Sequence, residues 1–250
     1  MDSSPYKANL KIAHDLDVGD WILDGLAPWV LFSETPVTIG IVIPKGFESY
    51  LLIQHTHEGD WMGNLGSESL TKLITVLTKF TSTPHDCYIA LWEGNGWTNP
   101  GAFAYYVPVK FPKLHHFRMK YFRSLRFHFF SRRKFVRRPT NVQNPPNTLP
   151  EGIIDAPRFT LPNRGYLLTK GPIEESNNLG WYPGEFLHRQ APNLLWPADR
   201  HWILATEIDF NVTLLAGSEE MISAIENLDF FTTQRFKVTD AIADLPIVEH

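Results

Sequence analysis

The chain has 250 residues, of which 43% are hydrophobic and 20% are charged, a composition typical of a soluble globular protein. Its single cysteine, Cys87, excludes an internal disulfide and fits a reducing compartment. The N-terminus lacks the apolar core of a signal peptide, and no apolar run reaches the ~20 residues of a membrane-spanning helix. We therefore expect a cytoplasmic protein without a transmembrane segment.

The charged residues are distributed unevenly. Of the 23 lysines and arginines, 11 lie between Lys110 and Arg138, a stretch that contains no acidic residue. The rest of the chain carries 12 basic and 27 acidic residues. We call residues 110–138 the basic segment, and its contrast with an acidic body is the most unusual feature of the composition.

In chain order, the first elements can be predicted from composition and spacing. Apolar residues at helical spacing make Ser67–Phe80 the clearest helix. The other predicted elements before the basic segment are a flexible tail (1–17), a short helix (Asp20–Leu26), a buried strand (Val37–Ile43), strands at Phe47–His55, Cys87–Trp92 and Ala104–Val109, and a turn at 93–96.

The basic segment is predicted to form a basic amphipathic helix. Its apolar stripe consists of Leu114, Phe117, Tyr121, Phe122, Leu125 and Phe129. Pro139 ends the helix, and residues 139–152 are rich in Pro and Asn, which is typical of an exposed linker. Its candidate contact residues are Arg123, Arg126, Arg132 and Arg133.

Three binding modes fit the basic segment. It could bind nucleic acid, through arginines on phosphates and aromatic rings on bases. It could lie on an anionic membrane surface. It could instead pack on the body of the protein, with its charges toward the chain's own acidic surface or that of a protein partner. The acidity of the body argues against dedicated nucleic-acid binding, because its field opposes an approaching polyanion.

The C-terminal half is predicted to contain strands at Phe159–Leu161, Gly165–Thr169, Trp202–Ile208 and Val212–Leu215, a long surface loop at Gly171–Pro197, a turn at Trp196–Asp199, and a helix from Ser218 to Leu228. Strands outnumber helices and do not alternate with them. The predicted fold class is therefore α+β, a largely antiparallel sheet with a few helices packed on it and a basic helical insertion. Residues 18–250 are expected to form one domain.

Glu207 and Asp209 are the candidate catalytic residues. Two positions apart on a strand, they would share one face with Cα atoms ~6.6 Å apart. Such a pair can perform acid–base chemistry or hold a divalent cation. Alternatively, it lies at a strand end, exposed or paired with Arg158 or Arg164. His201 would share this face, but at ~20 Å it is too distant to join one metal site.

No complete enzyme motif occurs in the sequence. His55, His57, Glu58 and Asp60 match no standard zinc spacing, so a solvated loop is favoured over a metal site. Cys87, within an apolar strand, is expected to be buried and unreactive. We expect no metal and no cofactor.

Eight tryptophans are an unusually large number. Trp97, Trp181 and Trp196 are candidate contacts with a ligand or a partner, and core packing is the alternative. Asp199 and Arg200 are further candidates, unless they fold back as a local pair.

Four stretches of the chain resemble, in the same order, a family of uncharacterised actinobacterial proteins: FESY with His55 soon after, CYIALWEGNGW, PRFTLPNRGYLL and PNLLWPADRHWILATEID. The resemblance covers residues 18–228, and the last motif is the most specific. The chain departs from the family at Leu195, where a second aromatic residue is usual, and in the basic segment, which resembles an insertion in a variable region. The resemblance implies no activity and assigns no catalytic residue.

A weaker similarity links the final strands and helix to the immunity-type proteins of the SUKH superfamily, which would imply binding to another protein. Together these features favour a non-enzymatic interaction protein that recognises another macromolecule through the aromatic loop around Trp181 and the basic segment. The alternatives are a divalent-metal-dependent hydrolase that uses Glu207 and Asp209, and a nucleic-acid or membrane binder.

Overall fold

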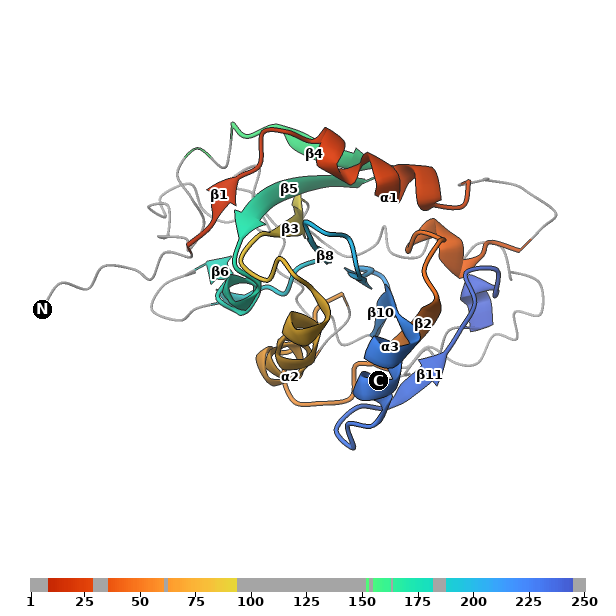
Figure 1. The fold of residues 1–250 in the computed structure, drawn as a ribbon. Coiled ribbons are helices and arrows are strands. Elements are labelled where there is room, and N and C mark those ends of the chain that lie inside the picture. Colours follow the sequence, from red (N-terminus) through yellow and green to blue (C-terminus); the bar gives the residue numbers. More distant parts are fainter. Residues whose placement is uncertain are drawn as a thin grey trace, which may run out of the picture.

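The computed structural model describes residues 9–28, 36–60, 63–93, 152, 155–162, 164–181 and 188–244. Within these residues, nine strands form one antiparallel sheet with helices packed on it (Figure 1). The predicted α+β class with a largely antiparallel sheet is therefore confirmed. The basic segment, most of the linker, and the strand expected at Ala104–Val109 lie outside the described residues.

The strands follow one another across the sheet in the order β1 (Lys11–Ile12), β5 (Arg164–Gly171), β3 (Cys87–Trp92), β8 (Leu194–Pro197), β9 (Ile203–Thr206), β10 (Val212–Gly217), β2 (Ser49–Gln54) and β11 (Thr233–Arg235). In addition, β4 (Arg158–Leu161) pairs with β5. A separate hairpin joins β6 (Gly180–Trp181) to β7 (His188–Arg189).

Both faces of the sheet are covered, which explains why its central strands are apolar along their whole length. On one face lie α2 (Ser67–Leu77) and α3 (Glu219–Glu226), in contact with each other (Figure 1). The other face is covered by α1 (Asp20–Gly25), the 3-10 turn η2 (Ile39–Ile41) and several aromatic side chains. Short 3-10 turns complete the described part: η1 (Asp17–Gly19), η3 (Thr78–Phe80), η6 (Ile173–Asn177) and η7 (Ile242–Asp244).

The three helices predicted within the described residues form where their apolar spacing and caps indicate, whereas the predicted basic helix lies outside these residues. Leu70, Leu73 and Leu77 of α2 are buried. The hydroxyl of Ser218 accepts a hydrogen bond of 3.2 Å from the amide of Met221, so that Ser218 caps α3 as expected.

The buried strand expected at Val37–Ile43 is not formed. The chain instead makes η2, and its backbone pairs with the C-terminal segment: the amide of Ile39 donates to Asp240 and that of Gly40 donates to Val238. A Cβ on Gly40 would lie 3.0 Å from the carbonyl oxygen of Val238, so a side chain here would require the neighbouring backbone to shift by a few tenths of an ångström. Of its β-branched side chains, Ile39 and Ile43 are buried in the core without pairing in the sheet, whereas Val37 is exposed.

Two other segments also differ from expectation. Leu194–Pro197, predicted to end a surface loop, is the buried strand β8 between β3 and β9. Lys11 and Ile12, placed in a flexible tail, pair with Lys170 and Thr169 of β5. Both strands are short, and their partners lie far away in the sequence, which local patterns do not show.

Among the described residues, no helix combines the length and the apolar character needed to cross a membrane.

Candidate functional site

Polar residues gather at one end of the sheet, which we call the polar end. Here β2, β3 and β9 finish and β5, β8 and β10 begin. Most of the polar side chains buried in the described part lie at or beside it: His55, Asn64, Gln190, Asn193, Thr206, Asn211 and Thr213. Buried polar groups need partners, so this end is organised by hydrogen bonds rather than by apolar packing alone.

Arg164 joins the two predicted acidic residues. Its Nη2 lies 2.5 Å from Oε1 of Glu207 and 3.1 Å from Oδ2 of Asp209. The three side chains are only 25%, 16% and 35% exposed, respectively. The guanidinium carbon of Arg164 lies 5.8 Å from the ring centroid of Trp92. Glu207 and Asp209 follow the end of β9 rather than lying on it, but the predicted pairing with an arginine is present.

Burial shapes the protonation of this cluster. It raises the pKa of Glu207, and the charge and hydrogen bond of Arg164 oppose that rise without cancelling it. Burial would lower the pKa of Arg164, but Glu207 and Asp209 reverse the direction. Burial and the nearby Glu207 also raise the pKa of Tyr166. The positive charge of Arg164 thus compensates both carboxylates.

Asn193, which precedes β8, connects the two strands on either side of β8 at the polar end by side-chain hydrogen bonds. Its Oδ1 accepts a hydrogen bond of 2.8 Å from the amide of Trp92, and its Nδ2 donates to the carbonyl oxygen of Thr206 at 3.2 Å. Asn193 is 2% exposed, and it ties the ends of β3 and β9 together across β8. No sequence motif singles out this asparagine, because its partners come together only in the fold.

The expected solvated loop around His55 is wrong for this residue. His55 is 3% exposed, and its Nε2 lies 2.8 Å from Oγ1 of Thr213. His57 stacks on Phe230 with ring centroids 3.8 Å apart. Asp60 accepts hydrogen bonds from the amides of His57 and Gly66, and so folds the loop onto the start of α2. In the described part of the chain, no group of three His, Cys, Asp or Glu residues is placed to hold a metal.

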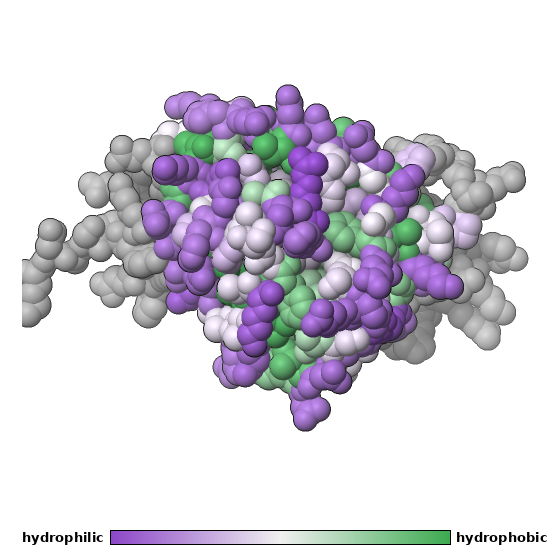
Figure 2. Space-filling view, viewed as in Figure 1, coloured by the Kyte–Doolittle hydropathy of each residue, from purple (hydrophilic) through white to green (hydrophobic). Residues whose placement is uncertain are grey.

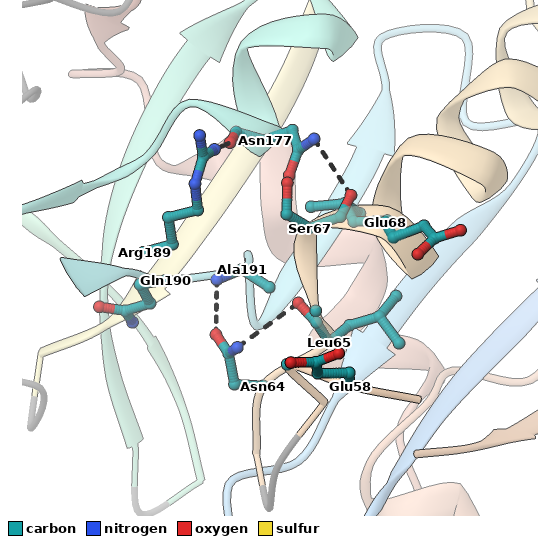
Figure 3. Close-up of a pocket in the computed structure, with 12 residues that line it drawn as sticks. Glu58, Asn64, Leu65, Ser67, Glu68, Asn177, Arg189, Gln190 and Ala191 are labelled. Atoms are coloured by element: carbon teal, nitrogen blue, oxygen red, sulfur yellow. Dashed lines mark hydrogen bonds between the residues drawn. The ribbon is translucent and has the colours of Figure 1, made fainter. Parts of the chain in front are cut away.

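A cavity of about 410 Å³ opens beside the first turn of α2. It lies between the loop after β2 and the segment that leads into β8 (Figure 3). Two hydrogen bonds connect the segments that line it. Oδ1 of Asn64 accepts a hydrogen bond of 2.7 Å from the amide of Ala191, and Nδ2 of Asn177 donates one of 3.2 Å to the carbonyl oxygen of Ser67. The wall carries both signs of charge, with Glu58, Glu68 and Arg189. The sequence gives no signal of this cavity.

The chain leaves the sheet near the polar end, after β3, to enter the residues that include the basic segment. Glu93, the last described residue before it, lies 3.4 Å from Arg158, the first residue of β4. Between them passes β5 at Gly165, where a Cβ would lie 2.5 Å from a carboxylate oxygen of Glu93. Glycine at this position lets Glu93 reach across β5.

The structure places Trp196 in the core. It is 0% exposed and stacks on Tyr88 with ring centroids 5.4 Å apart, which agrees with the core-packing alternative. In place of the local pair with Arg200, Asp199 accepts hydrogen bonds from Thr81 and Ser82. The Arg200 guanidinium lies 5.7 Å from the ring centroid of Trp21.

Of the other predicted contact residues, one lies in a described strand and the rest lie outside the described residues. Trp97, Arg123, Arg126, Arg132 and Arg133 lie outside the described residues. Trp181 belongs to β6 by its backbone.

Comparison with known proteins gives no relative: no family model, no curated protein and no solved structure matches this chain.

Proposed function

We propose that this chain is a non-enzymatic interaction protein, which recognises another macromolecule, foremost a protein, through the basic segment and the aromatic loop around Trp181. The observation that supports this most is that the strands before and after residues 94–151, which include the basic segment, both pair with β5.

These two strands, which we call the anchors, are close together. Trp92 of β3 and Phe159 of β4 both pair with Tyr166, one on each side of β5. Since neighbouring strands lie ~4.8 Å apart, β3 and β4 are separated by about 10 Å at this point. Residues 94–151 are therefore an insertion between neighbouring parts of one sheet, and the strands on either side keep their pairing through β5.

The charge of the body favours a protein partner over a bare polyanion. Outside the basic segment, acidic residues outnumber basic ones by 27 to 12. Such a body repels nucleic acid at long range, whereas a folded protein offers both signs of charge. Nucleic acid or an anionic membrane remains the second candidate, supported by the 11 basic residues of a segment without acid.

A native pull-down tests the proposal. The bait is the whole chain, compared with a version in which residues 95–150 are replaced by a flexible Gly/Ser linker of about ten residues, which can extend to about 30 Å. One stoichiometric protein partner that is lost with the replacement supports the proposal. Recovery of only salt-sensitive nucleic acid or lipid would overturn it in favour of polyanion binding, and binding by neither version would overturn both.

Trp181→Ala tests the aromatic loop in the same experiment. We expect partner binding to fall while the urea midpoint stays close to that of the whole chain. Loss of stability with unchanged binding would place Trp181 in the core and remove the loop from the contact surface.

A further inference from the structure

We infer that, without a partner, the basic segment docks on an acidic strip of the same chain, formed by Asp15, Asp17, Asp20 and Asp24. This inference rests on the proposed role of the basic segment as a contact surface, and it names the surface that competes with the partner.

The acidic strip is exposed and unneutralised. All four aspartates are exposed, and none forms an ion pair with a residue that the structure describes. The sequence has no lysine or arginine between Lys11 and Lys45. Arg200 reaches the ring of Trp21 without pairing with the strip. Hydrophilic residues cover this upper edge of the molecule, over α1 and the segment before it (Figure 2).

The strip also presents an apolar side chain. Leu23 is 45% exposed and lies on α1 between Asp20 and Asp24. It is one of two large apolar side chains that the described residues expose, the other being Val37. The basic segment combines arginines and lysines with apolar residues at predicted helical spacing, so its composition matches both components of this surface.

The anchors of the insertion lie next to the strip. The ring of Phe159 in β4 packs so closely on Gly19, between Asp17 and Asp20, that no Cβ fits there. Gly152 lies beside Ile12, since a Cβ on it would be 3.7 Å from the Ile12 side chain. Residues 94–109 and 139–151 connect the anchors to the basic segment, and even the shorter connection spans up to about 40 Å when extended. The strip is within reach.

Attachment to the same chain makes this docking competitive. A tethered segment meets its site at an effective concentration of about millimolar, so weak contacts suffice. At physiological salt, charges interact over only ~8 Å, so docking requires close contact and weakens as salt rises. A partner with an acidic surface must therefore displace the acidic strip from the basic segment in order to bind it.

Zero-length carbodiimide cross-linking tests this inference on the full chain without a partner. We expect mass spectrometry to find links from Lys110, Lys113, Lys120 and Lys134 to the strip, and these links to disappear in 0.5 M NaCl. The charge-removing variant D15N/D17N/D20N/D24N should make trypsin cleave the basic segment severalfold faster. The matched control E58Q/E174Q/E220Q/D229N removes four exposed acids elsewhere and should leave the cleavage rate unchanged.

Links spread evenly over acids outside the strip, or equal cleavage of both variants, would overturn the inference. The pull-down above is independent of this result, because loss of docking leaves partner capture intact, whereas an absent partner leaves the cross-links intact. An unchanged thermal midpoint in both variants shows that neither result reflects unfolding.

Discussion

Arg164, the first residue of β5, donates a hydrogen bond of 2.5 Å to Glu207, which follows β9 three strands away in the sheet. Strands β3 and β8 lie between β5 and β9 in the sheet. The contact therefore crosses the polar end and links segments that share no backbone pairing. Asp209 accepts from the same nitrogen at 3.1 Å. One guanidinium thus compensates two carboxylates in the turn between β9 and β10.

Replacing this cation should destabilise the fold. Arg164→Met leaves Glu207 and Asp209 without their partner, and we expect the free energy of unfolding to fall by about 2 kcal/mol, less than for a fully buried pair because the cluster is partly exposed. Urea unfolding measures it. Lys45→Met, at an exposed residue without an ion pair among the described residues, should change stability by less than about 0.5 kcal/mol. Equal effects would contradict a structural role for Arg164.

The protonation of Glu207 predicts a pH dependence. Its folded pKa is raised above the ordinary value, so the folded chain binds this proton more tightly than the unfolded chain does. The contribution of this protonation to the free energy of unfolding is fully present below the unfolded pKa of about 4.3, and it is lost as pH rises through the folded pKa. The stability of the wild type relative to Glu207→Gln should therefore fall from pH 4 to pH 7. A relative stability that rises with pH would mean that the ion pair outweighs burial.

The same cluster predicts the response to metals. Because Arg164 already compensates both carboxylates, we expect calorimetric titration with Mg²⁺, Mn²⁺ or Zn²⁺ to give no binding heat. A stoichiometric heat that is lost in Glu207→Gln would revive the metal-dependent hydrolase.

Arg235 should control acid stability at the opposite edge of the sheet. Hydrogen bonds from Arg235 to Glu219 hold the pKa of this carboxyl at about 2. Because this pKa is lowered, the stabilisation is present above the unfolded pKa and is lost as pH falls toward 2. Arg235→Gln should flatten the fall of the urea midpoint between pH 5 and pH 2. Lys237→Gln, which removes a neighbouring exposed cation, should retain the wild-type slope.

Cys87 should be unreactive in the folded chain. Burial, with smaller contributions from Asp199 and Asp86, raises the pKa of its thiol to about 12, and the side chain is 0% exposed. Since thiolate is the reactive form, a disulfide reagent at pH 8 should modify Cys87 only after addition of denaturant. Fast modification without denaturant would show that β3 opens readily.

Much of the fold could be predicted from local patterns. The strand Cys87–Trp92 was predicted to the residue, and α2 begins at Ser67 as its apolar spacing indicates. Ser218 was predicted as the cap of α3 because its hydroxyl acts on an amide three residues away. Each prediction depends on interactions within a few residues. β8 and η2 were missed because distant backbone partners decide whether an apolar run becomes a strand.

The candidate site divides in the same way. The sequence by itself determined which groups carry charge, that Glu207 and Asp209 lie close together, and that the basic segment is separate in composition from an acidic body. Only the tertiary structure decided that Arg164 rather than Arg158 binds the pair, that Asn193 joins β3 to β9, and that Trp196 is core. Charge and local spacing are properties of neighbouring residues, whereas these contacts join residues whose separation in sequence carries no information about their distance in space.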